Sequence, residues 1–442
     1  MSVAAVRPRL GLAVNWRQFT LLVVVNAFVG AMVGIERTVL PLLAERDFGI
    51  ASTSAALSFL VAFGLVKAGT NLAAGHLSDR YGRKRLLVAG WLAALPVAPL
   101  VIWAPSWGWV VVANAFLGLN QGLAWSTTVI MKIDLAGPQR RGLALGLNEA
   151  AGYGAVAVAA AVTGVLAAAY GPRPAPFLLG IGIAVTGLLL SVLFVRETSD
   201  YAAEEARLHH QAGSPRPFAE TFAETSLRDR SLSAVCQAGL VNNLNDALVW
   251  GMMPLFLARE GLSVGRIGVV AAMYAGSWGL AQLATGAWSD AVGRKPLIVS
   301  GLWLQAAGIV GLVVADRYVG WVLAALVMGL GTALVYPTLL AAIGDRAHPS
   351  WRASAIGVYR LWRDLGYAVG GLLVGVVADV VTMDAAILVV AVITACSGLF
   401  VATRMRETKL DPRDRAYADR HRPSSSYRRR DPRTTSRPQT PA

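Results

Sequence analysis

Apolar stretches alternate with short charged connections along most of the chain, from about residue 19 to residue 403. Twelve such stretches occur, and each has about the length that a helix needs to cross a bilayer. Because a segment surrounded by lipid must satisfy its own backbone hydrogen bonds, we expect every stretch to be helical. They cover residues 19–43, 53–74, 86–104, 108–133, 142–169, 175–195, 232–258, 264–288, 296–315, 318–343, 353–378 and 384–403.

The composition agrees with a chain that lies in lipid. Of the 442 residues, 55% are hydrophobic and only 15% are charged, which is too little polar surface for a water-soluble protein of this size. Both cysteines, Cys236 and Cys396, fall within apolar stretches, so we interpret them as packing residues rather than as a disulfide or a metal site. Arg7, Arg9 and Arg17 precede a first stretch that is too long for the core of a signal peptide, which predicts an uncleaved first span.

The lysine and arginine residues predict the orientation. The connections form two alternating sets, and one set is much richer in these residues. Such connections stay in the cytoplasm, so we expect both termini to be cytoplasmic and the chain to lie in the cell membrane. The net charge of +14 therefore indicates orientation and contact with anionic lipid rather than nucleic-acid binding. The rich set holds Arg7, Arg9, Arg17, Arg80, Arg83, Lys84, Arg85, Lys132, Arg140, Arg141, Arg196, Arg207, Arg216, Arg228, Arg230, Arg294, Lys295, Arg346 and Arg352, and the other holds Arg46, Arg173, Arg259, Arg266 and Arg317.

The longest internal connection divides the chain into two parts with six stretches each. It is charged and contains Gly213, Ser214 and Pro215, which is typical of a linker. His209 and His210 lie in it without further ligands nearby, so no metal site is predicted. The tail is rich in Arg, Pro and Ser, and we expect it to be disordered, either solvated or touching anionic lipid. The predicted parts are an N-terminus (1–17), a first bundle (18–195), the linker (196–231), a second bundle (232–403) and the tail (404–442).

A charged motif between the second and third stretches recurs in the second half. Residues 75–84, with the sequence GHLSDRYGRK, share their Gly, Ser, Asp, Gly, Arg and Lys with residues 286–295, which lie 211 positions later. Residues 134–141 match residues 345–352 in Asp, Pro and Arg at the same offset. Two matches at one offset indicate two halves of similar fold.

The motif Gly-x-x-x-Asp-Arg-x-Gly-Arg-Lys-Arg resembles the signature loop of the major facilitator superfamily of secondary transporters. The resemblance covers residues 18–403 and implies an all-α membrane fold of two pseudo-symmetric six-helix bundles. It also implies a latch that holds the halves together while the cavity faces outward; alternatively, Arg83, Lys84 and Arg85 only fix the topology. The latch residues would be Gly75, Asp79, Arg80, Gly82, Arg83 and Asp134, with Gly286, Asp290, Gly293, Arg294 and Asp345 in the second half.

Ionisable residues inside the spans are the candidates for substrate binding or ion coupling. They are costly in lipid, so we expect them to face the protein interior. The resemblance places the second span against the eleventh and the fifth against the eighth, which predicts a pair between Lys67 and Asp364. Glu149 and Arg360 occupy equivalent positions in the two halves. The candidates are Asp246, Glu149, Arg360, Arg363, Asp364, Lys67 and Arg37, with Asn243 and Gln121 as hydrogen-bonding neighbours.

Three readings of particular residues stay open at this point. Glu36 and Arg37 form either a pair at the outer rim or part of the site. Trp125, Trp250, Trp278 and Trp362 either stack on an organic substrate or pack helices. Proton coupling is open, because Glu149 or Asp246 would titrate if desolvated.

The leading functional hypothesis is a secondary transporter without cofactor or metal that exports a small molecule, acting as a monomer. Uptake of a metabolite or organic anion is the alternative, and a transport-inactive receptor is an alternative of another class. Exporters of the superfamily usually carry an arginine where this chain has Gly118, and a Gly-Pro pair where it has Gly152-Tyr153-Gly154, which weakens the assignment to drug antiporters. No nucleotide-binding or catalytic pattern is present, so we expect neither ATP coupling nor an enzyme.

Overall fold

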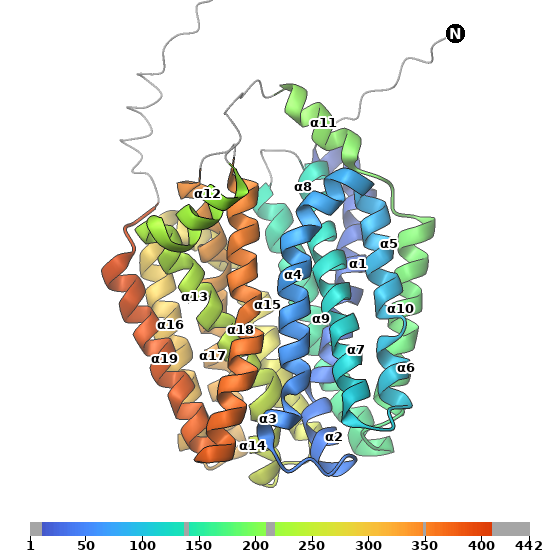
Figure 1. The fold of residues 1–442 in the computed structure, drawn as a ribbon, viewed down its shortest axis with the longest axis vertical. Helices are drawn as coiled ribbons and strands as arrows, with labels where there is room; N and C mark the ends of the chain where they lie inside the picture. Colours follow the sequence, from blue (N-terminus) through green and yellow to red (C-terminus); the bar gives the residue numbers. More distant parts are fainter. Residues whose placement is uncertain (1–10, 137–140, 209–216, 348–350, 409–442) are drawn as a thin grey trace, which may run out of the picture. The chain divides into compact units, whose positions relative to one another are not determined.

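The computed structural model describes residues 11–136, 141–208, 217–347 and 351–408, and all regular secondary structure in these ranges is helical (Figure 1). Residues 1–408 form one compact unit. The predictions made for the tail after residue 408 and for His209 and His210 lie outside the described residues.

In the first half, several predicted spans consist of consecutive helical elements. Pro41 lies just after the break between α1 and α2, and Pro96 lies in the break between α5 and α6. Proline favours such breaks because it has no backbone N–H group to continue the helical hydrogen bonds. The elements are α1 (Leu12–Arg37), α2 (Leu40–Arg46), α3 (Thr53–Ala56), α4 (Ser58–Tyr81), α5 (Arg83–Ala94), α6 (Val97–Ile102), α7 (Trp107–Asn120), the π-helical turn η1 (Gln121–Trp125), α8 (Ser126–Ala136), α9 (Arg141–Tyr170) and α10 (Ala175–Leu193).

The connection between the halves is partly helical, which the sequence did not predict. It contains α11 (Ser199–Leu208), α12 (Phe218–Ala223) and the π-helical turn η3 (Glu224–Arg228). The Ser226 hydroxyl accepts a hydrogen bond of 2.9 Å from Trp362 Nε1, so this part of the linker packs on the second half. Asp229 then caps the next helix by accepting hydrogen bonds from the backbone N–H groups of Ser231 and Leu232.

The second half repeats the architecture of the first. A π-helical turn interrupts its first span directly after Ala247, whereas the π-helical turn of the first half lies in the fourth span, between α7 and α8. The elements are α13 (Arg230–Ala247), η4 (Leu248–Met252), α14 (Met253–Arg259), α15 (Val264–Val292), α16 (Arg294–Val314), α17 (Tyr318–Arg346), α18 (Arg352–Val380) and α19 (Met383–Arg404).

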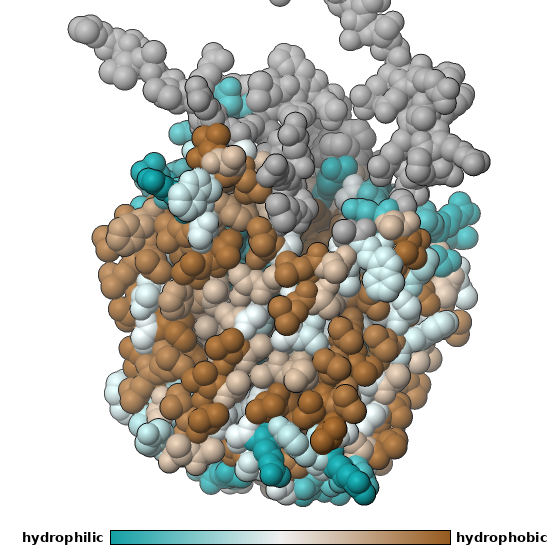
Figure 2. All heavy atoms as spheres, turned by 180° about the vertical axis from the view of Figure 1, so that it is seen from behind, coloured by the Kyte–Doolittle hydropathy of each residue, from teal (hydrophilic) through white to brown (hydrophobic). Residues whose placement is uncertain are grey.

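In the described part of the chain, nine helical stretches are long and apolar enough to cross a membrane. The other three predicted spans are helical too, but each is interrupted: α3 with α4, α7 with η1 and α8, and α13 with η4 and α14. Figure 2 shows the consequence on one face of the molecule, where apolar side chains cover the middle and hydrophilic side chains gather toward both ends. This distribution suits a lipid environment.

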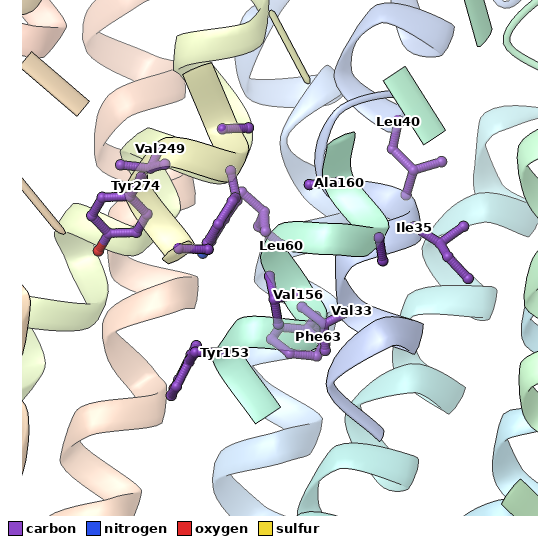
Figure 3. Packing of buried hydrophobic residues seen from close by; sticks show 14 of the residues in the cluster. Val33, Ile35, Leu40, Leu60, Phe63, Tyr153, Val156, Ala160, Val249 and Tyr274 are labelled. Carbon is purple, nitrogen blue, oxygen red and sulfur yellow. The ribbon is translucent and has the colours of Figure 1, made fainter. Parts of the chain in front are cut away.

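The halves meet along two helix pairs, α4 with α18 and α9 with α15, which confirms the packing that the resemblance implies. A Cβ atom on Gly64 would lie 2.7 Å from the backbone N of Ala368, so no larger residue fits there. Such small residues let helices approach closely in membranes. Figure 3 shows core residues of both halves, including Phe63 from the first and Val249 and Tyr274 from the second, in one buried cluster.

The two ends of the helices differ in what they carry. Helices α11 and α12 lie at one end, which we call the linker end, and α2, α3 and α14 lie at the other, which we call the α3 end (Figure 1). The repeated motif loops join α4 to α5 and α15 to α16 at the linker end.

Candidate functional site

Buried charges from both halves meet between α1, α4, α13 and α18. Arg37 ends α1, Lys67 lies on α4, Asp246 on α13, and Arg363 and Asp364 on α18. None of these five residues, which we call the central cluster, is more than 9% exposed. The structure thus brings together five of the predicted candidates.

Asp364 connects the two halves. Lys67 Nζ and Arg363 Nη1 each lie 3.5 Å from its Oδ1 atom. The amide groups of Asn243, at 3.4 Å, and Asn71 also donate to this carboxylate. The pair between Lys67 and Asp364 is the one that the sequence predicts, and it joins α4 of the first half to α18 of the second.

Asp246 is bonded by tyrosines. Tyr274 donates its hydroxyl hydrogen to Oδ1, and Tyr367 donates to Oδ2 at 3.0 Å. Arg363 and Lys67 act on Asp246 electrostatically without a hydrogen bond to it. The two acids of the cluster therefore differ: Asp364 has cations as direct partners, and Asp246 has phenols.

Arg363 ties the cluster to a group of aromatic side chains. Its Nη2 atom donates to the Tyr153 hydroxyl at 3.2 Å, and its guanidinium lies 4.1 Å from the centroid of the Tyr336 ring. Tyr153 in turn stacks on Trp278 with 3.5 Å between ring centroids. Trp250 meets Tyr274 edge-on at 5.4 Å. In this conformation both tryptophans pack against tyrosines.

Glu36 and Arg37 are both inside the protein. They are 1% and 0% exposed, so the interpretation as a pair at the outer rim is wrong. The reason is that α1 ends at Arg37 while the chain continues through α2, which places both residues about two turns below the end of the span. The guanidinium of Arg37 lies 4.7 Å from the centroid of the Phe63 ring and 5.9 Å from that of Tyr367.

Glu149 and Arg360, the equivalent pair, lie in different contacts. Glu149 Oε1 accepts hydrogen bonds from Trp125 Nε1 at 3.1 Å and from the Asn148 amide at 2.9 Å, all within the first half. Arg360 Nη1 donates to the Ser126 hydroxyl at 3.0 Å and so crosses from α18 to α8. Of the two, only Arg360 forms a hydrogen bond between the halves among the described residues.

Two polar residues serve the interior of the first half. Gln121 Nε2 donates to the Val29 carbonyl at 2.9 Å, away from the central cluster. Lys132 is 0% exposed and donates to the Leu22 carbonyl at 3.1 Å, so its assignment to the surface charges that fix orientation is wrong. The physical reason is that α8 continues to Ala136, which keeps Lys132 inside the bundle.

The motif loops have the same geometry in both halves. Gly82 and Gly293 separate consecutive helices with φ angles of 90° and 112°, a region that favours glycine. Arg83 and Asp134 are both predicted latch residues, and Arg83 Nε lies 3.3 Å from Asp134 Oδ2. In the second half Arg294 pairs with Asp345 at 2.9 Å and with Asp290 at 2.6 Å.

These motif contacts all lie within one half. The side chain of Asp79 and the surroundings of Gly75 lie outside what the structure describes. Arg80 is exposed, and a Cβ atom on Gly286 would meet nothing within 4 Å. The latch between the halves therefore stays a prediction.

One glutamate in each half binds the motif loop and was not among the residues predicted from the sequence. Glu197 accepts hydrogen bonds of 3.0 Å from the backbone N–H groups of Arg83 and Lys84, and Glu407 accepts bonds of 2.9 and 3.0 Å from the equivalent groups of the second half. Each glutamate thus caps the N-terminus of the helix after the loop. The signal in the sequence was an Arg-Glu-Thr triplet at 196–198 and again at 406–408.

The environment of Glu197 favours its charged form. Partial burial opposes ionisation, but hydrogen bonds from Ser199 and from the amides of Lys84 and Arg83 outweigh it and hold the pKa of Glu197 below its ordinary value. A Cβ atom on Gly82 would lie 2.8 Å from Glu197 Oε2, which is a second reason for glycine in the loop.

At the α3 end, one carboxylate joins the two halves. Asp379, near the end of α18, accepts hydrogen bonds from the Ser52 and Ser54 hydroxyls at 2.8 and 2.6 Å. It also accepts from the backbone N–H groups of Thr53 and Ser54 at 2.6 and 3.0 Å. A carboxylate of the second half thus caps the N-terminus of a helix in the first.

Comparison with known proteins decides the family. The model of the Major Facilitator Superfamily matches residues 21–233 and 235–435, which is most of the chain. The chain belongs to the major facilitator superfamily. Consequently it is a multi-pass membrane protein of the two-domain fold of that superfamily, whose members are transporters.

Individual relatives of the superfamily are distant. The chain is 25% identical to "Uncharacterized MFS-type transporter YddS" of Bacillus subtilis, over 81% of this chain and 84% of that protein. It is 23% identical to "Multidrug resistance protein MdtG" of Enterobacter lignolyticus, over 89% and 94%. It is 26% identical to "Probable 4-methylmuconolactone transporter" of Cupriavidus pinatubonensis, but spans only about half of that protein (52%) and uses 51% of its own length.

The structure explains why this member of the superfamily has glycine at position 118. A Cβ atom there would lie 2.8 Å from the Phe63 carbonyl oxygen and 3.1 Å from Val66 Cβ. Helix α7 touches the backbone of α4 at this point, so the position has no room for the arginine that the resemblance leads one to expect.

Proposed function

We propose that the protein is a secondary active transporter that moves a small organic molecule across the cell membrane by alternating access, with export driven by proton entry. The observation that carries the proposal is the central cluster, where Lys67 of one half pairs with Asp364 of the other. Buried ionisable groups are costly in a membrane protein, and they mark substrate or ion pathways. Transporters built from repeats hold their sites at this boundary between halves.

The contacts at the α3 end support alternating access. Asp379 ties α18 to α3 there, and release of this contact would let that end open. We assign the linker end to the cytoplasm, because the connections there stay far richer in Lys and Arg even when Lys132 is removed from the count. In this orientation the Asp379 contact closes the outside. All groups of the cluster come from one chain, so a monomer is sufficient.

Asp246 is the proposed coupling acid. It is fully buried and bonded by Tyr274 and Tyr367, and neither phenol compensates a full negative charge. Binding or loss of one proton at Asp246 would change the net charge that faces the surrounding cations Arg37, Lys67 and Arg363. Asp364 is less suited, because Lys67 and Arg363 are its direct partners.

Export is favoured by the relative that covers most of both chains among those described above, which is named as a multidrug resistance protein. Uptake of a metabolite is the second candidate, supported by the relative named for 4-methylmuconolactone transport. We assign no enzymatic reaction, in line with relatives that are all named as transporters or resistance proteins.

Transport into proteoliposomes under an imposed pH gradient tests the proposal. The purified chain is given five labelled probes: benzoate, 1-naphthoate, ethidium, tetraphenylphosphonium and glucose. Antiport predicts accumulation when the interior is acidic, and symport predicts accumulation when the exterior is acidic, so the sign of the gradient separates export from uptake. Protein-free liposomes correct for the passive distribution of weak acids and bases.

Two variants test the role of Asp246. Asp246→Asn should abolish accumulation driven by the gradient and keep exchange between labelled and unlabelled substrate. Glu149→Gln changes the other candidate acid, which is bonded within the first half, and should keep both activities. Normal gradient-driven accumulation by Asp246→Asn would exclude it as the coupling acid. No transport of any probe in either gradient would contradict the proposed function.

A further inference from the structure

Arg37 is a buried cation whose nitrogens have no hydrogen-bond acceptor. Its side chain is 0% exposed, and Nε, Nη1 and Nη2 all lack a partner. Its close neighbours are instead the faces of Phe63, at 4.7 Å, and Tyr367, at 5.9 Å. Phe63 belongs to α4 and Tyr367 to α18, so the guanidinium lies where the two halves meet.

The other buried cations of the described chain have acceptors. Lys67 and Arg363 share the carboxylate of Asp364, and Lys132 donates to a backbone carbonyl. Burial of a charged group without a hydrogen-bonding partner is unfavourable, because the group loses its hydrogen bonds to water and gains none in the protein. Cation–π contact with two rings recovers only part of this cost. Arg37 is therefore the cation of the cluster that is arranged for an additional anion.

Neighbouring acids do not fill this role. Glu36 precedes Arg37 on α1 and acts on it electrostatically, but none of the guanidinium nitrogens of Arg37 donates a hydrogen bond to its carboxylate. Asp246 acts on Arg37 electrostatically, but its oxygens accept hydrogen bonds from Tyr274 and Tyr367. The five N–H donors of the guanidinium thus remain available.

We propose that Arg37 binds the carboxylate of a transported aromatic monocarboxylate. A guanidinium presents a planar fork that matches a carboxylate in a bidentate pair. One carboxylate is inferred because Arg37 is the single acceptor-free cation of the cluster, the other two being paired with Asp364. An aromatic ring is inferred because Phe63 and Tyr367 flank the guanidinium. Their ring centroids lie 5.2 Å apart, and the angle between the ring planes is 79°. This inference rests on the proposed function, since it places the anion in the same site.

The position of Arg37 also gives the route. It is the last residue of α1 before the chain turns toward the α3 end, where the halves are joined by Asp379. Separation of α4 from α18 at that end uncovers the guanidinium between Phe63 and Tyr367. In Figure 3, Phe63 lies among the labelled core residues of the first half, beside Val33 and Val156.

Equilibrium binding to the purified full chain tests the inference. The probes are labelled benzoate and 1-naphthoate, with benzamide as the neutral match and hexanoate as the carboxylate without a ring. We expect the wild type to bind 1-naphthoate and benzoate more tightly than hexanoate, and benzamide hardly at all. Arg37→Gln should weaken binding of both aromatic acids about 30-fold or more, because it removes one partner of a buried charge pair. Arg37→Lys keeps the charge and loses the fork, and should weaken binding by a smaller factor.

Controls keep the result interpretable. Lys132→Gln removes a buried cation of the first half that already has an acceptor, and should leave binding within about twofold. Thermal unfolding of each variant checks folding, and the acids should raise the melting temperature of the wild type but not of Arg37→Gln. If Arg37→Gln does not fold, Arg37→Lys and competition between benzoate and benzamide give the same decision.

Two results would overturn the inference: no binding of either aromatic acid to the folded wild type, or equal binding by wild type and Arg37→Gln. Gradient-driven transport of ethidium or glucose, without acid binding, would retain the proposed function and reject the anion site. Acid binding that depends on Arg37, without transport of any probe, would retain the anion site and reject the proposed function.

Discussion

Replacement of Asp379 by asparagine is expected to open the α3 end more often. The aspartate carboxylate accepts four hydrogen bonds from Ser52, Thr53 and Ser54 at 2.6 to 3.0 Å. Asparagine keeps one acceptor oxygen, loses the charge that favours a helix N-terminus, and turns an N–H group toward other donors. Loss of a cap costs about 1 kcal/mol, and the exposed position argues against more. That energy corresponds to about a fivefold shift in the equilibrium between closed and open forms.

Labelling of a buried cysteine measures this shift. The native Cys236 and Cys396 are first replaced, and Leu60→Cys is introduced as the reporter because Leu60 is 0% exposed and lies against Gly371 of the other half. A membrane-impermeant maleimide should then react about five times faster when Asp379→Asn is added.

The control for this measurement is Asp316→Asn. Asp316 is an exposed acid at the same end that pairs with its neighbour Arg317, so the labelling rate should not change. Ser54→Ala should raise the rate, and should add little to Asp379→Asn because both remove the same contact. An unchanged or slower rate in Asp379→Asn would refute the role given to this carboxylate.

Three further outcomes follow from other parts of the molecule. Glu197→Gln should lower the melting temperature at neutral pH. Because the folded-state pKa of Glu197 is lowered, its contribution is present above the ordinary glutamate range and is lost as pH falls through the folded value, so a difference in melting temperature that does not shrink as the pH is lowered below the ordinary glutamate range would contradict the cap. Gly366→Ala should lower the free energy of unfolding by roughly 1–3 kcal/mol, because its Cβ would clash with the Leu240 carbonyl oxygen, whereas the Cβ of Gly182→Ala would meet nothing within 4 Å and that variant should be neutral or stabilising. Thermal unfolding compares the two variants, and equal effects would refute the packing argument. Lys132→Met should lower the melting temperature little or raise it, since it replaces a buried charge by an apolar chain of similar length, and a large loss would show that Lys132 is needed inside the bundle.

The helical spans could be predicted from the sequence because lipid imposes one strong rule on every apolar stretch. The partner of Lys67 could be predicted too, since the repeat and the resemblance fix which spans face each other. The position of Arg37 stayed open between the outer rim and the site, because the break between α1 and α2 depends on tertiary packing. Lys132 was misplaced for a related reason: from the sequence alone, a lysine one turn inside a helix resembles one at its end.

The short contacts of backbone groups were also beyond the sequence. Glu197 and Asp379 accept hydrogen bonds from backbone N–H groups of residues more than a hundred positions away. The repeated Arg-Glu-Thr triplet marks Glu197 in the sequence, but it does not say which backbone groups the glutamate binds. Helices α11 and α12 were missed because short polar segments have weak helical preference of their own.

The paired glutamates have a consequence for exchange of parts between related chains. In each half, a carboxylate of the same half, Glu197 or Glu407, accepts hydrogen bonds from the backbone at the motif loop. These caps do not depend on a group from the other half. A hybrid that joined the first 230 residues of this chain to the second half of a related transporter would therefore keep an intact glutamate cap in each half. Whether the hybrid folds would depend on the interface formed by α4, α9, α15 and α18, where the halves of the two parent proteins would have to pack against each other.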